Sequence, residues 1–414
     1  MPGSLARRVV SEFPQASAPQ PAVDPLSVLI AVPTLDIGAA DAGALELVRI
    51  LTSAGHKAVV VSQGGRLVPD VVRSGGEFVA LGMASHNPAI MLRNALTLLR
   101  LVRKHHCDLV HAHGRASAWS AYLAARFARV PFLTSWYKGF RDQNALKHIY
   151  NGIMVRGDRV IAGSEQIAQL INDRYGTPWP RIAVLPASVD LARFDPSKVS
   201  RERIEAVRQA WGVGATTKVI LVVGRMLRRK GHHVAVRAVR RLKDRGLKDF
   251  LCVFVGEDTG RTRYSGELWD LVLSSKTVDV IRTNNGGLDL AAAYAAATVV
   301  VSAAVQPEGV QRALLEAQAM ARPVVVSDLG AGPEIVLAPP AVPEDRMTGL
   351  RVAPDDDAAL ATALLRIFSM PEPTRRAIGE RGREWVLAHF NAPTVAEQTL
   401  RLYGELAASR RLPR

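Results

Sequence analysis

Cysteine is scarce in this sequence of 414 residues, and aromatic side chains make up only 6% of it. The two cysteines, Cys107 and Cys252, cannot form a disulfide framework, and both lie beside or inside apolar, strand-like runs. That setting is typical of buried thiols in a reducing compartment. The longest uncharged run, residues 290–307, is close to the length of a membrane span. Its alanine-rich first half and the valines at 299–301 instead predict a helix followed by a buried strand.

Residues 1–25 lack the apolar h-region that a secretory signal peptide requires. They are rich in proline, alanine and serine, which predicts a disordered tail. We therefore expect a soluble, cytoplasmic protein.

Positive charge is the largest excess in the composition. Lys and Arg number 53 against 38 Asp and Glu, so the net charge is +15. This charge favours an acidic partner: a nucleotide, a phosphorylated glycolipid, an anionic membrane face or a nucleic acid. Nucleic acid is not expected, because aromatic residues are few and no nucleic-acid motif occurs. Residues 88–106 alternate leucines with arginines and a lysine in a pattern that would suit a helix on an anionic membrane surface. An ordinary Rossmann helix has the same pattern, and we favour it.

Short apolar runs alternate with helical segments in two series, separated by an Asp- and Pro-containing break at 189–196. Continuous apolar runs joined by helices are typical of parallel strands covered on both faces. The pattern predicts an α/β protein with two Rossmann-like domains in tandem, followed by helical residues from about 374 to 406. The predicted strands lie within 27–33, 57–62, 108–113, 131–136, 159–164, 181–188, 218–225, 250–257, 278–283, 299–303, 323–328 and 349–354.

Two glutamates, Glu308 and Glu316, follow the predicted strand at 299–303 and are eight residues apart. If Glu308 opens a helix, Glu316 lies ~12 Å further along it, which is comparable with the distance from the sugar to the ribose of a nucleotide-sugar. Two carboxylates could then accept hydrogen bonds from hydroxyls at both ends of one donor, while the helix N-terminus faces its phosphates. The spacing alone favours two glutamates on a surface helix. Their position after a strand makes the two interpretations equal.

A basic cluster follows the strand at 218–223. Arg225 and Lys230 leave the strand end, where the departing nucleoside diphosphate of a donor would need positive charge. The planar fork of Arg and the mobile ammonium of Lys suit a phosphate clamp. We predict a solvated helix face for most of the other basic residues in this region. The whole set consists of Arg228, Arg229, Arg237, Arg240, Arg241, Lys243 and Arg245.

In the first half, Gly38 follows the first strand, and His111 and His113 end another one. A glycine there permits close approach of a phosphate or sugar, and His113 could bond a sugar hydroxyl, although a structural role for this histidine is equally supported. The residues at 105–108 include two histidines, a cysteine and an aspartate. They lie at the opposite end of that strand, so no metal site is expected. The loop 329–334 could meet phosphate, or could be a plain turn.

Several segments together resemble the family-four retaining glycosyltransferases of the GT-B fold, and within them the bacterial lipopolysaccharide core glycosyltransferases. The similarity runs from about residue 27 to 406. It is carried by DLVHAHGRASAWSAYLAAR, VDLARFDP, GRMLRRKGHH and, most specifically, PEGVQRALLEAQAM with its two glutamates. The resemblance implies an acceptor-side domain at 26–190, a donor domain at 191–388, and a helix at 389–414 that returns to the first domain across a cleft.

The activity implied is transfer of a sugar from a nucleotide-sugar to a lipopolysaccharide-type or related glycan, with retained configuration and without a metal or other cofactor. By the same resemblance, Arg225 and Lys230 bind the diphosphate, Glu308 the donor sugar and Glu316 the ribose. Gly38 lies by the phosphates, His113 lies beside the sugar, and Arg312 belongs to the acidic motif of the donor site. Peripheral contact with the inner face of the cytoplasmic membrane is a further implication.

The sequence departs from the family pattern at several positions. The family's Gly-Gly loop reads Gly38-Ala39, its Glu-Arg pair reads Asp41-Ala42, and Tyr137 replaces a histidine. Further departures are Val310-Gln311 in the acidic motif, Gly330-Ala331 in the later loop and Asn284-Asn285 near a strand end. The departures leave an alternative open, a catalytically degenerate protein that acts as a binding or partner subunit, for example of a homologous glycosyltransferase. We favour the active enzyme, because the second-domain motifs are nearly complete.

Overall fold

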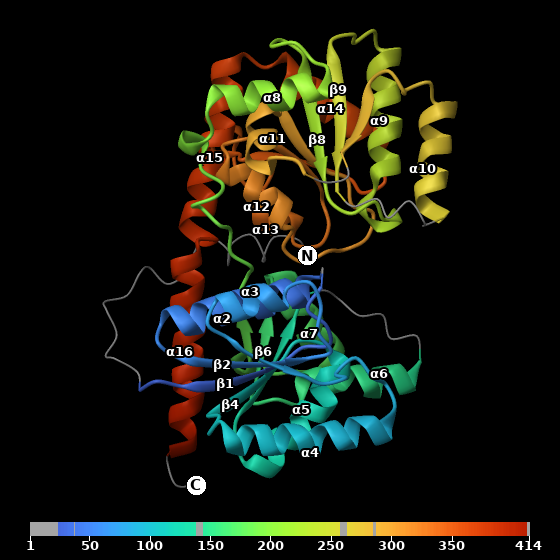
Figure 1. Cartoon of the computed structure of the whole chain (residues 1–414). Helices are drawn as coiled ribbons and strands as arrows, with labels where there is room; N and C mark the ends of the chain where they lie inside the picture. Colours follow the sequence, from blue (N-terminus) through green and yellow to red (C-terminus); the bar gives the residue numbers. More distant parts are fainter. Residues whose placement is uncertain (1–23, 37, 138–143, 257–262, 285–286, 412–414) are drawn as a thin grey trace. The chain divides into compact units, whose positions relative to one another are not determined.

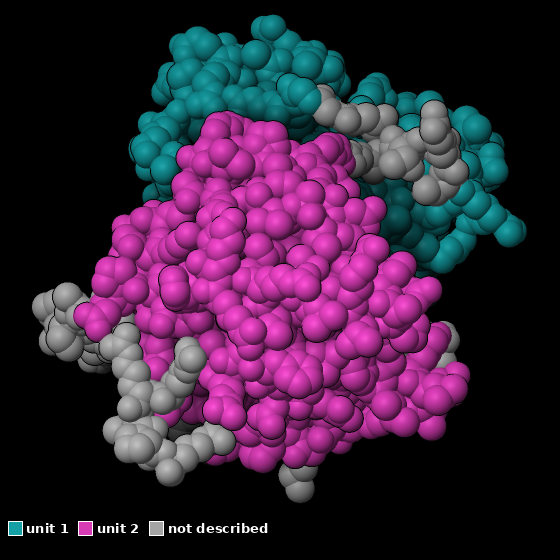
Figure 2. All heavy atoms as spheres, turned by 60° about the horizontal axis from the view of Figure 1, so that its bottom comes forward, with its two compact units in different colours: residues 1–13, 188–392 teal, residues 14–187, 393–414 magenta. Residues whose placement is uncertain are grey.

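The fold is taken from a computed structural model, which describes residues 24–411 except 37, 138–143, 257–262 and 285–286 (Figure 1). The predicted disordered tail lies outside the described residues apart from its last two positions. The described chain forms two compact units. Among the described residues, unit 1 holds 188–392, and unit 2 holds 24–187 together with 393–411 (Figure 2).

Unit 2 contains a seven-stranded parallel sheet with the order β3-β2-β1-β4-β5-β6-β7. One face is covered by α4, α5 and α7, and the other by α2, α3 and α16, which gives two apolar cores. The elements are β1 (Ser27–Ala31), α2 (Ala39–Ser53), β2 (Lys57–Ser62), α3 (Val68–Arg73), β3 (Glu77–Ala80), α4 (Pro88–Lys104), β4 (Leu109–Ala112), α5 (Arg115–Ala128), β5 (Phe132–Trp136), α6 (Ala145–Asn151), η1 (Gly152–Val155), β6 (Arg159–Ala162), α7 (Glu165–Tyr175), η2 (Trp179–Arg181), β7 (Ile182–Val184) and α16 (Ala392–Arg411).

Unit 1 contains a six-stranded parallel sheet with the order β10-β9-β8-β11-β12-β13. Its central strands are mostly apolar because helices cover both faces, whereas the edge strand β10 reads IRTN and is partly exposed. The elements are η3 (Pro196–Lys198), α8 (Arg201–Trp211), β8 (Lys218–Val223), η4 (Arg228–Lys230), α9 (His232–Asp244), β9 (Phe250–Val255), α10 (Arg263–Ser274), β10 (Ile281–Asn284), α11 (Leu290–Ala296), β11 (Val299–Ser302), α12 (Arg312–Ala319), β12 (Val324–Ser327), α13 (Gly332–Ile335), η5 (Glu344–Arg346), β13 (Gly349–Val352), α14 (Asp357–Ser369) and α15 (Glu372–His389).

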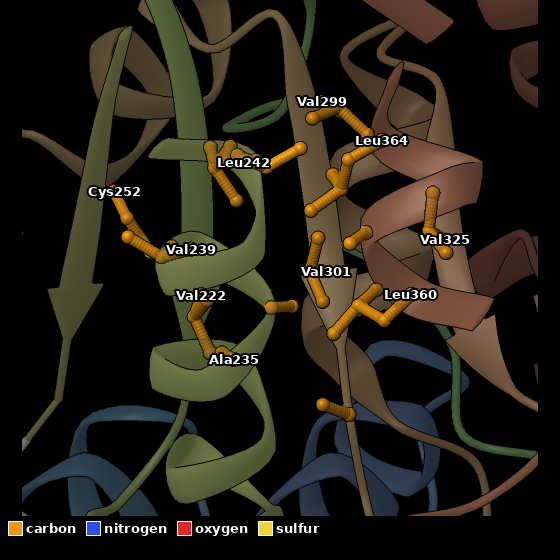
Figure 3. Packing of buried hydrophobic residues seen from close by; sticks show 14 of the residues in the cluster. Val222, Ala235, Val239, Leu242, Cys252, Val299, Val301, Val325, Leu360 and Leu364 are labelled. Atoms are coloured by element: carbon orange, nitrogen blue, oxygen red, sulfur yellow. The ribbon is translucent and has the colours of Figure 1, made fainter. Parts of the chain in front are cut away.

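The packing of unit 1 shows why its strands stay in place. In Figure 3, Ala235 and Val239 of α9 lie against Val222 of β8, while Leu360 and Leu364 of α14 lie beside the valines of β11 and β12. Each fully buried aliphatic side chain contributes about 1.5–3 kcal/mol. The core therefore holds the carboxyl ends of β8 and β11, from which the candidate site residues leave, at a defined spacing.

The predicted fold class is confirmed, since both sheets are parallel and Rossmann-like, and every predicted strand run overlaps a strand. The run at 290–307 is a helix followed by a strand, as predicted, and no helix among the described residues is long and apolar enough to cross a membrane. One strand, β3, was not predicted. It is a short, partly exposed edge strand and therefore has no continuous apolar run. The helical stretch predicted at 374–406 is interrupted between α15 and α16.

Candidate active site

Glu308 lies in the loop between β11 and α12, rather than at the start of a helix as the spacing argument assumed. The helix begins four residues later, at Arg312. The loop is held by the chain that follows β12. Gly330 adopts φ +64° with its Cα against the backbone of Glu308, and the Ala331 N–H donates to the Glu308 carbonyl at 2.9 Å. The carboxylate is thus placed by a backbone contact between two loops.

The Glu308 carboxylate forms ion pairs with both Arg229 and Lys230. Its side chain is only 8% exposed, so two cations compensate one buried negative charge. These cations sit in the short turn η4, which is tied to the Glu308 loop by a 3.0 Å hydrogen bond from the Val305 N–H to the Arg229 carbonyl. Arg229 is an exception to the predicted solvated face, because its side chain is ion-paired with the buried Glu308 carboxylate.

Burial and the positive charges of Arg229 and Arg225 lower the pKa of Lys230 to about 8. The ion pair with Glu308 acts in the opposite direction, since a nearby carboxylate favours the charged ammonium. Burial, and to a lesser extent the charge of Arg225, also lower the pKa of Arg229. Three cations and one carboxylate therefore gather after β8 and β11. The sequence indicated three of these four residues.

Glu316 lies on α12, and its Oε2 accepts a 2.8 Å hydrogen bond from the Tyr294 hydroxyl. Burial raises the pKa of Glu316, and the hydrogen bond from Tyr294 and the charges of Arg312 and Arg193 lower it in part. Arg312 is the first residue of α12 and is exposed. Tyr294 was not predicted as a site residue, although a lone hydroxyl in the apolar helix LAAAYAA is a usable signal.

In unit 2, His113 is buried just after β4, and Nδ1 of its ring is 2.8 Å from the Tyr137 hydroxyl. Tyr137 packs directly on the Cα of Gly43 in α2. Burial lowers the pKa of His113 to about 3, so the ring is neutral at pH 7. The neighbouring His111 bonds Tyr403 of α16 and Ser135 of β5 at 2.5 and 2.8 Å.

These side chains line a small pocket of about 60 Å³ over the carboxyl ends of β4 to β7, between α2 and α16. Gly38 caps α2 with an extended backbone (φ −158°). At the other end of β4, Asp108 and Cys107 contact Ser27. Among the residues that the structure describes, no group of three or more His, Cys, Asp or Glu side chains could hold a metal ion.

Two family models match the chain. Residues 41–193 match Glycosyltransferase Family 4, and residues 217–370 match Glycosyl transferases group 1.

Curated relatives agree with these matches. The chain is 28% identical to a D-inositol 3-phosphate glycosyltransferase of Salinispora tropica, over 74% of this chain and 65% of the relative, which is slightly less than two thirds of that protein. It is 30% identical to the D-inositol 3-phosphate glycosyltransferase of Nocardiopsis dassonvillei, over 74% of this chain and 72% of the relative.

Solved structures are similar over nearly the whole chain. A glycosyltransferase from Rickettsia africae ESF-5 superposes with a TM-score of 0.84 at 27% identity, covering 92% of this chain and 99% of the other. WaaG, a glycosyltransferase involved in lipopolysaccharide biosynthesis, superposes with a TM-score of 0.67 at 18% identity, covering 90% and 99%, and shares the fold. With both halves matched by family models and both sheets in place, this chain belongs to the family-four glycosyltransferases and is an enzyme of the GT-B fold.

Proposed function

We propose that this glycosyltransferase is active, takes a nucleotide-sugar donor in unit 1 and transfers the sugar with retention of configuration. The observation that carries the proposal is the ion-paired group of Glu308, Arg229 and Lys230, with Arg225 close by. Nucleoside diphosphate is an anionic leaving group, and preorganised cations stabilise it as charge develops. Because these cations belong to the protein, we propose that the reaction needs no metal.

Donor binding changes the partners of the cations. In the structure, Glu308 is ion-paired with both Arg229 and Lys230. We propose that a bound diphosphate attracts the two cations and leaves the Glu308 carboxylate to accept hydrogen bonds from the donor sugar. Glu316 takes the ribose hydroxyls through Oε1, because Tyr294 already occupies Oε2. His113 and Gly38 of unit 2 remain predicted donor contacts.

The decisive experiment is a panel of nucleotide-sugars assayed for hydrolysis and for transfer to glycan acceptors. Glu308→Gln should lower kcat by about 100-fold or more, since it removes a carboxylate at the reacting sugar. Glu267→Gln is the matched control, because Glu267 pairs with Arg228 of the same turn but not with Lys230. Equal activity of the parent and Glu308→Gln would remove the proposed role of Glu308.

The acceptor is proposed to be a lipopolysaccharide-type or related cell-envelope glycan, met at a membrane surface. The support is a surface of unit 2 that we call the α4–α6 face, where large apolar side chains are exposed. The start of α4 adjoins α6, since His86 bonds Tyr150 at 2.8 Å (Figure 1). The apolar members are Leu92, Leu96, Leu146 and Ile149, and the exposed cations of α4 are Arg93, Arg100, Arg103 and Lys104. Apolar side chains flanked by arginine and lysine suit an anionic bilayer surface.

Vesicle binding tests this part of the proposal. The protein should sediment with vesicles that contain phosphatidylglycerol and much less with pure phosphatidylcholine vesicles. Leu92→Gln with Leu96→Gln should weaken the binding several-fold. Leu273→Gln is the control, because Leu273 lies on α10 of unit 1 and is at least as exposed as the two leucines of α4. Equal binding to both kinds of vesicle, or no effect of the α4 changes, would contradict an anionic membrane partner.

The alternative is a catalytically degenerate partner subunit. Its support is Tyr137, which packs on Gly43 and replaces a family histidine beside His113. This alternative predicts nucleotide binding without turnover for any donor and acceptor in the panel. Turnover that depends on Glu308 would exclude it.

A further inference from the structure

Tyr294 is completely buried on α11, and its hydroxyl has a charged partner. A buried tyrosine hydroxyl needs such a partner, and here it is Oε2 of Glu316 at 2.8 Å. The helix that carries Tyr294 is itself fixed at its start. Asp289 caps it by accepting from the Ala292 N–H, and the same carboxylate binds Arg203 through two nitrogens at 2.7 and 3.0 Å. The hydroxyl therefore has little freedom to move.

The ring of Tyr294 is also held by contacts with the linker that precedes α8. Phe194 packs edge-on against it, with ring centroids 5.8 Å apart at 74°. The guanidinium of Arg193 lies over the Phe194 ring, 5.2 Å from its centroid. Arg193 is exposed, and its charge acts on both Tyr294 and Glu316. Arg193, Phe194 and Tyr294 thus form a chain of contacts that ends at the Glu316 carboxylate.

Burial favours the protonated form of Glu316, and three groups oppose this effect by favouring the ionised form. They are Tyr294 of α11, Arg312 of α12 and Arg193 of the linker. Their effect has a chemical consequence. An ionised carboxylate accepts hydrogen bonds from two ribose hydroxyls, whereas a protonated one presents a donor and loses acceptor capacity. The hydrogen bond from the Tyr294 hydroxyl engages Oε2, so Oε1 is the oxygen that we assign to a ligand.

We propose that Tyr294 and Arg193 are positioning residues for donor binding, which hold Glu316 ionised and oriented with Oε1 available to the ribose of the nucleotide. This inference rests on the proposed function, because it assigns the support of the donor site in unit 1. Neither residue touches the donor in this proposal. Both act through Glu316, Tyr294 by its hydrogen bond and Arg193 by its charge and its contact with Phe194.

The test is the affinity for uridine and guanosine diphosphates and their sugar conjugates, measured by calorimetry between pH 5.5 and 8. Tyr294→Phe keeps the ring and removes the hydroxyl. It should weaken binding of the nucleotide that the parent prefers by about tenfold at pH 7. It should also add a loss of affinity as the pH falls toward 6, because the pKa of Glu316 rises without the hydrogen bond. Arg193→Met should act in the same direction with a smaller effect, and Arg193→Lys should restore most of the affinity.

Tyr264→Phe is the matched control, since it removes a different tyrosine hydroxyl of unit 1, which bonds His233. Unchanged affinity and an unchanged pH profile for Tyr294→Phe would overturn the inference while the proposed function stands. A general loss of affinity with the same pH profile as the parent would indicate only a structural role, and would also overturn it. If the parent protein binds none of the nucleotides, the proposed function itself fails. Thermal unfolding of each variant identifies any that does not fold, and Arg193→Met then carries the test.

Discussion

The Tyr137 hydroxyl lies 2.8 Å from Nδ1 of His113, and the tyrosine ring rests on the Cα of Gly43. A Cβ at position 43 would lie 2.6 Å from the ring carbon Cζ of Tyr137. Strand β5, strand β4 and helix α2 are therefore joined at one point through a tyrosine that depends on a glycine. Tyr137, which replaces a family histidine, fits here only because residue 43 has no Cβ.

Gly43→Ala should destabilise the protein, although alanine favours a helix over glycine by about 0.5–1 kcal/mol. The added methyl group displaces Tyr137, and overpacking of this kind costs about 1–3 kcal/mol. The sign of the effect should reverse when Tyr137→Ala is already present, because only the helix preference of alanine then remains. Denaturant unfolding of the four proteins in this cycle measures the reversal. Gly43→Ala that stabilises both backgrounds would contradict the contact.

Gly330→Ala should impair donor binding, because the new Cβ would overlap the backbone of Glu308. The same change also strains a left-handed backbone (φ +64°), at a cost of about 1–2 kcal/mol. Gly287→Ala separates the two effects, because Gly287 has φ +68° and nothing within 4 Å of its Cβ position. Gly330→Ala should lose more stability than Gly287→Ala, because only its Cβ meets the Glu308 backbone, and only Gly330→Ala should lose nucleotide affinity. Calorimetric titration and thermal unfolding provide the two measurements.

The fold was largely predictable because parallel strands covered on both faces have continuous apolar runs. Strand β9, with the buried sequence FLCVFV, is a clear example. The edge strand β3 reads EFVA and has two exposed ends, so its local pattern resembles a loop. The sequence does not reveal the break between α15 and α16, because Phe390 lies inside it and apolar residues occur at helical spacing both before and after it.

The candidate site was predictable at the level of residue type but not of partners. The positions of Glu308, Lys230 and Arg225 after strand ends could be read from the order of elements. That Arg229 rather than Arg228 faces Glu308 depends on the turn η4 and on the bond from Val305. Such contacts join loops far apart in the sequence, and no periodic pattern encodes them.

Binding of nucleoside diphosphate should weaken as the pH rises from 7 to 9.5, because Lys230 has a pKa of about 8. The ammonium is charged below that value and neutral above it, so its attraction for phosphate is lost on the alkaline side. We expect the dissociation constant to rise several-fold and not more, since the guanidinium groups of Arg225 and Arg229 also attract the phosphates. Lys230→Arg should flatten the profile, and Lys218→Arg, on β8, should leave it as in the parent. A parent profile that is already flat would show that the ion pair with Glu308 keeps Lys230 charged.

Acid should destabilise unit 2 through its buried histidine pair. Burial lowers the pKa of His113 to about 3 and that of His111 well below 6.5. Between those values and 6.5 the unfolded chain binds protons that the folded chain does not, so stability falls as the pH decreases below 6.5. Each histidine contributes a slope of about 1.4 kcal/mol per pH unit. Hydrogen exchange of the amides in β4 and β5 between pH 7 and 5 reports this change in unit 2.

Substitution of the histidines identifies the source of that slope. His113→Asn should remove about half of it, because one of the two buried rings is lost. The titratable groups around the pair are Tyr403, Tyr137 and Glu46, and the two tyrosines do not change charge in this range. Substitution of the exposed His86 by asparagine should leave the slope unchanged. A slope that persists in full after His113→Asn would contradict this assignment, because the acid sensitivity would then come from groups other than the His113 ring.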